Sequence, residues 1–567
     1  MKKRIFVLMV AIVLMLSSVF VGCGDTEDSE YANRPIKVTF SYYYAGYGDA
    51  HYKAVAKDFM DNCNQDIYLK LVPYDDSTVM RSNIIAGTHE GDIIQLSVDM
   101  FRKQTLLEEI SDLYDKKVYG EDVTIAEKDI AVNGEEYSRK KYFTENYKDA
   151  SGAVKQGVFQ FPSGNLEGGY NFAYNATTLN QVFPNGYQLP VTTDEFFAFG
   201  DDMFERGAYL TSAAIKDIGG GDYLEYLYPA WFTQLVGKET YQNFYKGNYY
   251  DQTEQKWVRD ENATDGLEFL NQNKEQIEDT YAILEKLLKA DNDYIHRASS
   301  ELNYLDNDKV FAGAGYRTIK EKTGFLFIGS WLEHELKPLV EDETVPECEY
   351  GVMRVPVASA IVKKLAFAGN NSKYTGKMND ATLAAIIRAI DEGKDYTATK
   401  AAVNGIESLT EADFNIIYEA RKITMASGYS NIIIPKIKDA SKKNAIYEVM
   451  AYFASDRAQK VSAEATGGLE MMPFGQVNGE LETTVSRYTK EGKAVGKDSI
   501  PVDYAHVNDL FNLHVSVKWY HIPSGRLSAY FYNNSANKLK FSDLENQIKS
   551  SWNKDIATYK TAIAELS

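Results

Sequence analysis

The chain has 567 residues, with 81 acidic and 61 basic side chains and a formal net charge of −20 at pH 7. This excess argues against nucleic acid and anionic lipid headgroups as partners, because both select basic surfaces. The length is too great for one ordinary hydrophobic core and predicts about two to four domains.

The first 23 residues have the order of a secretory signal peptide. Basic residues at positions 2–4 precede an apolar run over residues 5–16, and a small residue stands before Cys23. We therefore expect the chain after Cys23 to lie outside the cytoplasm. An uncleaved membrane anchor is the alternative, because the run is close to the roughly 17 residues that a spanning helix needs. Residues 24–35 are acidic and aperiodic, which predicts a flexible tether.

Local hydrophobic patterns predict α/β structure from residue 36 onward. Alternating apolar residues indicate strands, and apolar residues on one face indicate helices. The predicted segments are, in order, residues 36–41 (strand), 49–59 (helix), 67–71 (strand), 77–86 (helix) and 93–96 (strand). This order predicts a mostly parallel sheet with helices on both faces.

The rest of the chain is α/β in pattern but less regular, and it contains no internal repeat. Its predicted strands cover residues 170–174, 325–328 and 432–435. Its predicted helices cover residues 193–204, 223–236, 277–288, 377–392, 410–426 and 446–453. Two α/β halves are therefore expected.

The numbers of cysteines and tyrosines further narrow the class of protein. Only Cys63 and Cys348 follow Cys23, which excludes a disulfide-dense scaffold and leaves open whether the two pair. The chain has 41 tyrosines beside 27 phenylalanines and 5 tryptophans. A tyrosine offers an apolar face with a hydroxyl at its rim, which suits the C–H faces and hydroxyls of sugar rings. A tyrosine-rich background composition explains the same count equally well.

Short stretches between residues 36 and 474 form an ordered set. They are Gly46-Tyr47-Gly48, Gly91-Asp92-Ile93-Ile94, Tyr174-Asn175, Pro229-Ala230-Trp231, Ile328-Gly329-Ser330-Trp331, Tyr350-Gly351-Val352, Ile433-Ile434-Pro435-Lys436 and Thr466-Gly467-Gly468. Together they resemble the extracellular solute-binding proteins of family 1, the carbohydrate-binding lipoproteins of ABC importers. Cys23 likewise resembles a lipobox cysteine, and the diacylation that this implies anchors a protein to a membrane.

The resemblance implies a periplasmic-binding-protein-like α/β fold, with a ligand cleft between two lobes joined by crossing strands. The first lobe is expected over residues 36–168 plus about 430–465. The second lobe is expected over residues 169–429 plus about 466–567. An insertion near residues 357–430 and a long extension after Phe474 depart from the family pattern.

Two tyrosines and one carboxylate are the candidate ligand contacts in the first lobe. Tyr44 and Tyr47 follow the first predicted strand, and ligands of α/β folds bind beyond the carboxyl ends of parallel strands. Asp99 follows the predicted strand at residues 93–96, where a carboxylate accepts hydrogen bonds from neighbouring sugar hydroxyls. Core packing of the tyrosines and capping of a helix by Asp99 are the alternatives.

The resemblance supplies five candidates in the second lobe. It implies that Trp231 and Trp331 stack on sugar rings. It also implies that Tyr170, Asn175 and Glu333 line the rim and form hydrogen bonds with the ligand. Core packing is the alternative for both tryptophans.

The sequence carries no motif of a known catalytic or metal centre. The G-x-S-x-G frame, closely spaced histidine pairs, Walker loops and dinucleotide fingerprints are all missing. We expect no catalysis, no cofactor and no metal. The expected protein is a monomer, lipid-anchored on the extracytoplasmic face of a bacterial cell membrane, which captures a carbohydrate and delivers it to ABC permease subunits by hinge closure.

Two other classes stay open. A secreted glycoside hydrolase needs only two suitably placed carboxylates, which the sequence cannot exclude. A surface polysaccharide-capture protein that feeds no transporter would share the same binding residues. A peptide or another polyol-like solute also remains possible as the ligand.

Overall fold

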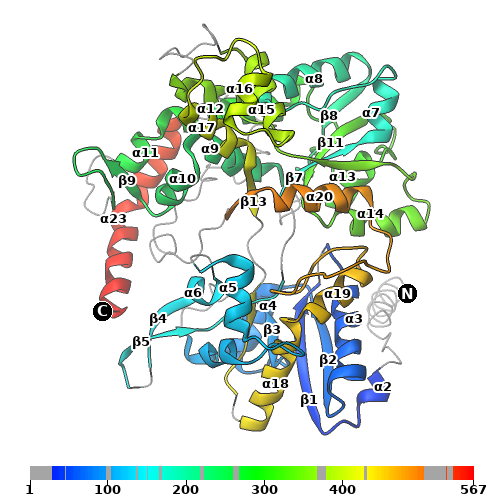
Figure 1. Cartoon of the computed structure of the whole chain (residues 1–567), viewed down its shortest axis with the longest axis vertical. Helices are drawn as coiled ribbons and strands as arrows, with labels where there is room; N and C mark the ends of the chain where they lie inside the picture. Colours follow the sequence, from blue (N-terminus) through cyan, green and yellow to red (C-terminus); the bar gives the residue numbers. More distant parts are fainter. Residues whose placement is uncertain are drawn as a thin grey trace, which may run out of the picture.

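The computed structural model describes residues 28–44, 46–96, 104–135, 138–149, 151–164, 169–216, 223–259, 267–366, 378–426, 431–437, 439–503, 532 and 540–566. The expected signal peptide, Cys23 and Asp99 lie outside these residues. The described chain folds into two lobes, each built on its own sheet (Figure 1).

The first lobe is built on a five-stranded sheet in the order β2-β1-β3-β14-β6. Its strands are β1 (Ile36–Tyr43), β2 (Ile67–Tyr74), β3 (Ile93–Gln95), β6 (Phe161–Pro162) and β14 (Asn431–Ile433). The first three strands are parallel, as the sequence predicts, and β14 pairs antiparallel with both β3 and β6. A segment from late in the chain therefore completes the first sheet.

The first lobe also contains helices and a hairpin. These are α2 (Asp28–Tyr31), α3 (Ala50–Asp58), η1 (Phe59–Cys63), α4 (Ser77–Ala86), η3 (Gln104–Leu106), η4 (Ser111–Asp115), α5 (Ile125–Asn133), α6 (Arg139–Tyr142), β4 (Thr144–Lys148), β5 (Val154–Val158), α18 (Ala440–Phe453) and α19 (Asp456–Ala465). The helices predicted over residues 49–59, 77–86 and 446–453 are thus confirmed.

Aromatic side chains join the helices of the first lobe to its sheet. Phe40 of β1 is buried and meets Tyr52 of α3 edge-on, with 4.9 Å between ring centroids. Phe453 of α18 contacts Phe40 at a centroid distance of 5.6 Å. Helix α4 begins at Asp76, whose carboxylate accepts hydrogen bonds from two backbone N–H groups, and ends at Gly87 in the left-handed region (φ 69°).

The second lobe is built on a four-stranded mixed sheet in the order β12-β7-β11-β8. Its strands are β7 (Asn171–Asn175), β8 (Ala208–Thr211), β11 (Lys322–Ile328) and β12 (Tyr350–Met353). Strand β7 is antiparallel to β11 and β12, and β11 is parallel to β8. The predicted strands at residues 170–174 and 325–328 correspond to β7 and β11.

Most of the helices belong to the second lobe. They are α7 (Ala176–Val182), α8 (Thr193–Glu205), η5 (Tyr223–Tyr226), α9 (Leu227–Val236), α10 (Lys238–Tyr245), α11 (Glu268–Asn271), α12 (Lys274–Leu288), η6 (Ala290–Asn292), α13 (Tyr304–Phe311), α14 (Leu332–Glu341), η7 (Ser359–Lys364) and α20 (Arg487–Lys497). A small hairpin, β9 (Asn248–Asp251) with β10 (Lys256–Arg259), lies beside them.

The insertion near residues 357–430 packs into the core of the second lobe. It contains α15 (Asp380–Asp391), α16 (Tyr396–Ala402), α17 (Glu411–Lys422) and β13 (Ile423–Ala426). The helix predicted over residues 410–426 is too long, because β13 leaves the helical conformation and pairs with β15 (Ile500–Asp503). Buried residues from α15 and α17, such as Ile387 and Ile417, belong to the same cluster as the second sheet.

The extension beyond Phe474 also packs on the second lobe. Its last helix, α23 (Phe541–Leu566), buries Ile548 and Trp552 in the second core, and the Trp552 ring stacks on Phe269 at 6.0 Å. Among the described residues, no helix combines the length and apolar composition that crossing a membrane requires. Cys63 and Cys348 are both free thiols and do not pair.

Among the described residues, the chain changes lobe three times: between Gly164 and Gly169, between Ala426 and Asn431, and after Phe474. Described residues that flank these changes lie close together. The backbone N–H of Tyr170 donates to the carbonyl of Met425 (2.9 Å), and a Cβ added to Gly164 would lie 2.0 Å from the carbonyl oxygen of Met471. Met471, Met472 and Phe474 lie in the first core, so the last return to the second lobe comes later than the expected residue 466.

Candidate functional site

The parallel strands of the first lobe end at one edge, which carries three tyrosines. Strand β1 ends at Tyr43, β2 at Tyr74 and β3 at Gln95. The Tyr43 N–H donates to Gln95 Oε1 (3.1 Å), and the Tyr74 hydroxyl donates to the Gln95 carbonyl. Tyr43 and Tyr44 are exposed, at 42% and 53%, whereas Tyr42 is buried. This edge is where α/β sheets bind ligands.

An aromatic cluster of four residues, Tyr170, Tyr223, Tyr226 and Trp331, lies on the second lobe. Trp331 follows β11 and begins α14. Its ring centroid is 5.4 Å from that of Tyr170 and 5.3 Å from that of Tyr223, both in edge-to-face arrangements. Tyr226 lies 4.7 Å from Tyr170. Four rings are thus held in fixed orientations by packing against one another.

The loop after β1 reaches this aromatic cluster from the first lobe. The Tyr47 ring meets Trp331 edge-on at 5.7 Å, and the Tyr47 hydroxyl is 2.5 Å from Ser330 Oγ. A Cβ added to Gly46 would lie 2.8 Å from Trp331 Cδ1, so the approach requires glycine. The two lobes are therefore in direct contact at the aromatic cluster.

Two carboxyl groups, Asp308 of α13 and Glu335 of α14, lie beside the aromatic cluster. Each carboxyl group shifts the pKa of the other, so the two interact directly, and two carboxyl groups in such contact share a proton. Burial raises the pKa of Glu335 to about 7. Burial and the Glu335 charge together raise the pKa of Asp308 well above its ordinary value. The pair is therefore protonated in part at neutral pH.

Two histidines also face the contact between the lobes. His51 of α3 is 2% exposed, and burial together with the charge of His334 lowers its pKa to about 3. Burial likewise lowers the pKa of His334, which lies on α14 with its ring 6.4 Å from that of Tyr47. Both rings are neutral at pH 7, so the contact is uncharged at this point.

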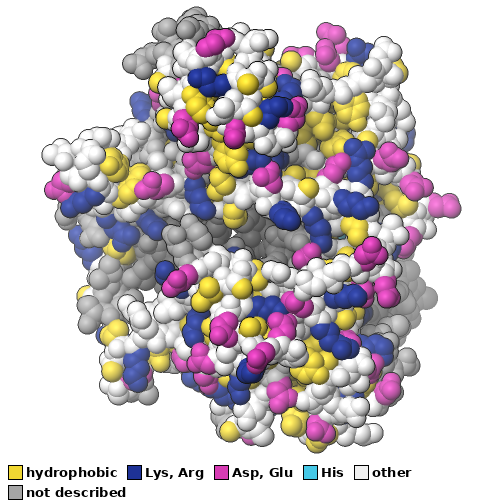
Figure 2. Space-filling model, viewed as in Figure 1, with side chains coloured by type: hydrophobic (Ala, Val, Ile, Leu, Met, Phe, Trp, Pro, Cys, Tyr) yellow, Lys and Arg dark blue, Asp and Glu magenta, His cyan; other side chains and the backbone are white. Residues whose placement is uncertain are grey.

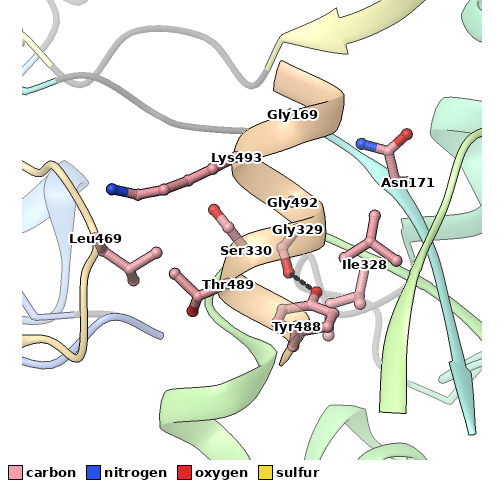
Figure 3. A pocket seen from close by; sticks show the side chains of 11 residues that line it. Gly169, Asn171, Ile328, Gly329, Ser330, Leu469, Tyr488, Thr489, Gly492 and Lys493 are labelled. Carbon is pink, nitrogen blue, oxygen red and sulfur yellow. Dashed lines mark hydrogen bonds between the residues drawn. The ribbon is translucent and has the colours of Figure 1, made fainter. Parts of the chain in front are cut away.

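A small pocket with a cavity volume of about 20 Å³ opens between α20 and the ends of β7 and β11 (Figure 3). Ser330, Thr489 and Lys493 line it from the second lobe, and Leu469 lines it from the first. The Lys493 ammonium extends across the lobe boundary and pairs with Glu470 (2.7 Å). The molecular surface is hollowed along this boundary (Figure 2).

The structure brings together several of the residues predicted for the site. Tyr47, Tyr170 and Trp331 contact one another directly or through shared partners. Tyr44 lies apart from them, exposed at the edge of the first sheet. Glu333 accepts hydrogen bonds from Ser486 and Thr489, both at 2.8 Å, and so fastens α20 to α14.

The structure places two other predicted residues in the interior. Trp231 is fully buried in α9, and its Nε1 donates to the Pro356 carbonyl (3.0 Å). Asn175 is also fully buried: its Oδ1 accepts from the Thr178 N–H at the start of α7, and its Nδ2 donates to the Phe311 carbonyl. These contacts assign both residues to packing and capping, because neither faces the boundary between the lobes.

Sequence reasoning missed several residues of the site. Tyr43, Tyr74 and Gln95 are the last residues of β1, β2 and β3, and two of them lie just beyond the strands predicted at residues 36–41 and 67–71. Residues at the carboxyl ends of parallel strands share one edge of the sheet, which was the signal that could have identified them. Glu335 stands four residues after Trp331, which places it on the same helical face. The sequence offers no comparable signal for Tyr223 or Asp308, which reach the aromatic cluster only through the tertiary fold.

No family model matches the chain, and no curated protein matches it in sequence. Solved structures do match over most of its length. The bacterial solute receptor AcbH, described as having an exclusive preference for β-D-galactopyranose, is 12% identical, with a TM-score of 0.50 over 93% of this chain and 99% of that chain. RafE in complex with raffinose is 14% identical, with a TM-score of 0.49 over 92% and 100%. A chitin oligosaccharide binding protein is 13% identical, with a TM-score of 0.49 over 92% and 99%.

These proteins are binding proteins rather than enzymes. The match to AcbH covers 93% of this chain and therefore extends over both lobes. The chain therefore has the two-lobed fold of the solute-binding proteins, as the resemblance in its sequence implied.

Proposed function

We propose that the protein is a solute-binding protein that captures a carbohydrate between its lobes. The aromatic cluster around Trp331 is the observation that carries this proposal. Its rings are fixed by mutual packing, so stacking on a sugar would cost little rotamer entropy. The exposed Tyr43 and Tyr44 offer further aromatic surface on the opposite lobe. The sugar preference described for AcbH supports the same ligand class.

Capture would proceed by hinge closure. The ligand would bind first to one lobe, and the second lobe would add contacts that exist only when the lobes meet. The close packing of the connections at Tyr170, Met425 and Met471 supports this idea, because a hinge needs few residues to absorb the motion. The contact of Tyr47 with Ser330 and Trp331 would belong to the closed form.

The protein would act at the outer face of a bacterial cell membrane. Acylation of Cys23 would hold it there, through the segment that precedes α2, whose Tyr31 is already buried in the first lobe. The closed, loaded form would then deliver its sugar to ABC permease subunits as a monomer. The strongly acidic composition supports attachment by acyl chains rather than by charge, because anionic headgroups repel it.

Hydrolysis is the competing function, and the geometry of the carboxyl pair does not favour it. The two carboxyl groups of a retaining glycosidase lie about 5 Å apart, and those of an inverting enzyme lie further apart. The Asp308 and Glu335 carboxyl groups interact directly, so they lie closer together than the carboxyl groups of either kind of glycosidase. This pair therefore suits recognition rather than bond cleavage.

Isothermal titration tests the proposal. The full-length chain, in a detergent without a sugar headgroup, would be titrated with neutral and charged oligosaccharides, and the sugar would then be recovered and sized. Micromolar or tighter binding with intact sugar is the expected result. Shortened sugar would establish a hydrolase, and failure of every saccharide to bind would remove carbohydrate as the ligand.

A further inference from the structure

The carboxyl pair beside the aromatic cluster lacks a positive partner. Asp308 is 2% exposed, and its Oδ2 has no hydrogen-bond partner. Burial and the mutual contact alone set the pKa values of both groups, with no lysine or arginine among the causes. In the described part of the chain, neither carboxyl group forms an ion pair. A buried acidic pair in this state is costly unless a cation neutralises it.

Another buried carboxylate of the protein is satisfied in full. Asp129 of α5 is completely buried, and it accepts hydrogen bonds from the backbone N–H groups of Arg139 and Lys140 and from the Asn133 side chain. The pair of Asp308 and Glu335 has no such donors. The pair thus resembles a binding site for a missing group more than a structural anchor.

The pair also lies where a ligand between the lobes would arrive. Glu335 stands one helical turn after Trp331 on α14, and a Cβ added to Gly46 of the first lobe would lie 2.9 Å from Glu335 Oε1. The carboxyl group is therefore covered by the backbone of the opposite lobe, next to the Trp331 indole. Separation of the lobes would uncover the Glu335 carboxyl group.

We propose that Asp308 and Glu335 bind the ammonium group of the ligand, which makes the protein's solute an amino sugar. This inference rests on the proposed function. An ammonium carries three donors, enough to bridge two carboxylates, and the aromatic faces of Trp331 and Tyr223 add a cation–π attraction. The sugar ring attached to the amine would stack on the remaining rings of the aromatic cluster.

Binding of the ammonium would expel the proton that the pair shares. Because the pKa of Glu335 is about 7, the pair holds that proton in about half of the molecules at pH 7 and in most of them at pH 6. The proton then passes to the buffer. The other titratable groups that feel the Glu335 charge are Tyr223 of η5 and Tyr488 of α20, and burial raises the pKa of each further above its ordinary value. Both stay neutral, so the carboxyl pair alone would account for the proton.

The test compares an amine with its neutral acetamide on the same sugar. The full-length chain would be titrated with glucosamine dimers, trimers and tetramers and with their N-acetylated forms. Each titration would be run at pH 6, where the amine carries its charge and the carboxyl pair holds its proton, in phosphate and in bis-Tris, whose different ionisation enthalpies report proton release. We expect the amines to bind about tenfold or more tightly than the acetamides, with close to one proton released.

Two variants of α14 test whether the preference for amines depends on the carboxyl pair or on another part of the helix. Glu335→Gln keeps the shape and the hydrogen bond to Asp308, and it should abolish both the preference for amines and the proton release. Glu341→Gln is the matched control, because Glu341 lies on the same helix with its side chain 67% exposed. The Glu341→Gln variant should leave the preference for amines and the proton release unchanged. Circular dichroism and melting curves would establish that each variant is folded.

Three results would overturn the inference. They are acetamides that bind as tightly as amines, amine binding without proton release, and a Glu335→Gln variant that keeps the preference. If only neutral sugars such as raffinose bind, the proposed function stands and this inference fails. If no saccharide binds at all, the proposed function fails as well.

Discussion

Tyr47 of the first lobe and Ser330 of the second lie with their hydroxyl oxygens 2.5 Å apart. They join two segments that are distant in the sequence, the loop after β1 and the turn between β11 and α14. The same tyrosine places its ring edge-on against Trp331. The stability of the closed arrangement should therefore depend on this one side chain more than on its neighbours.

Replacement of Tyr47 by phenylalanine should weaken sugar binding without unfolding either lobe. The change removes a hydroxyl contact worth about 1 kcal/mol, so affinity should fall roughly fivefold. Titration calorimetry would measure the affinity, and small-angle scattering would show a larger radius of gyration. Tyr418→Phe, on the exposed face of α17, is the control. Equal affinities of the two variants would show that the hydroxyl contact does not support closure.

Replacement of Trp331 by alanine should reduce affinity about tenfold or more, because the ring is the centre of the aromatic cluster. Titration with the best sugar ligand measures the loss. The exposed pair of Trp257 with Glu239 on the β9–β10 hairpin provides the control Trp257→Ala. An unchanged affinity for the Trp331 variant would remove this residue from the site.

Replacement of Trp231 by alanine should instead destabilise the fold. The residue is fully buried and its indole N–H is hydrogen-bonded, so the loss should be about 3–5 kcal/mol in the free energy of unfolding. Denaturant titration would measure it. Any of this variant that remains folded should bind sugar with normal affinity, whereas a stable variant with lost affinity would return Trp231 to the ligand.

Replacement of Gly46 by alanine should hold the lobes apart. Its Cβ would come within 2.9 Å of both the Trp331 ring and Glu335 Oε1, so the loop must withdraw. We expect weaker binding and near-normal melting. Gly48→Ala is an informative control, since Gly48 has φ 62° and open space around it. That variant should lose about 1 kcal/mol of stability through backbone strain alone and keep the contact between the lobes.

Acid should destabilise the folded protein through His51. Burial lowers the pKa of His51 to about 3 in the folded chain, against about 6.5 when unfolded. The unfolded chain therefore takes up the proton first, and stability is lost as the pH falls below about 6.5. The cost of this one group should reach about 2 kcal/mol at pH 5. His51→Gln should flatten the dependence of melting temperature on pH, whereas His89→Gln, on the loop before β3, should not.

The sequence predicted residues 36–96 well because their signals are local, but it assigned residues 28–31, which form α2 with Tyr31 buried, to a flexible tether. The alternation through β1 and the cap and glycine stop of α4 need no tertiary information. The site was predicted only in part. Trp231 and Trp331 stand in equally aromatic motifs, but Trp231 lies within a wholly buried helix and Trp331 begins one at the lobe boundary. That difference depends on how α9 and α14 pack.

The carboxyl pair shows more clearly which features the sequence alone does not predict. Asp308 and Glu335 lie on different helices, and nothing in their spacing along the chain indicates that they share a proton. The strand β13 was likewise not predicted from the sequence, because its partner β15 lies far along the chain. Contacts of this kind follow from the fold and become visible only with it.

The sheet of the first lobe has a consequence for the order in which the protein can mature. Strands β1, β2 and β3 come early in the chain, but β14 arrives only after most of the second lobe has been made, with α20 and α23 of that lobe still to come. A chain synthesised or exported from its N-terminus therefore leaves one side of β3 without its backbone partner for most of that time. Contacts between such distant segments form slowly, and an unpaired strand edge is a site for aggregation. The first lobe should thus complete its folding only after most of the second lobe has been made. A chain with this topology would therefore not fold completely before export.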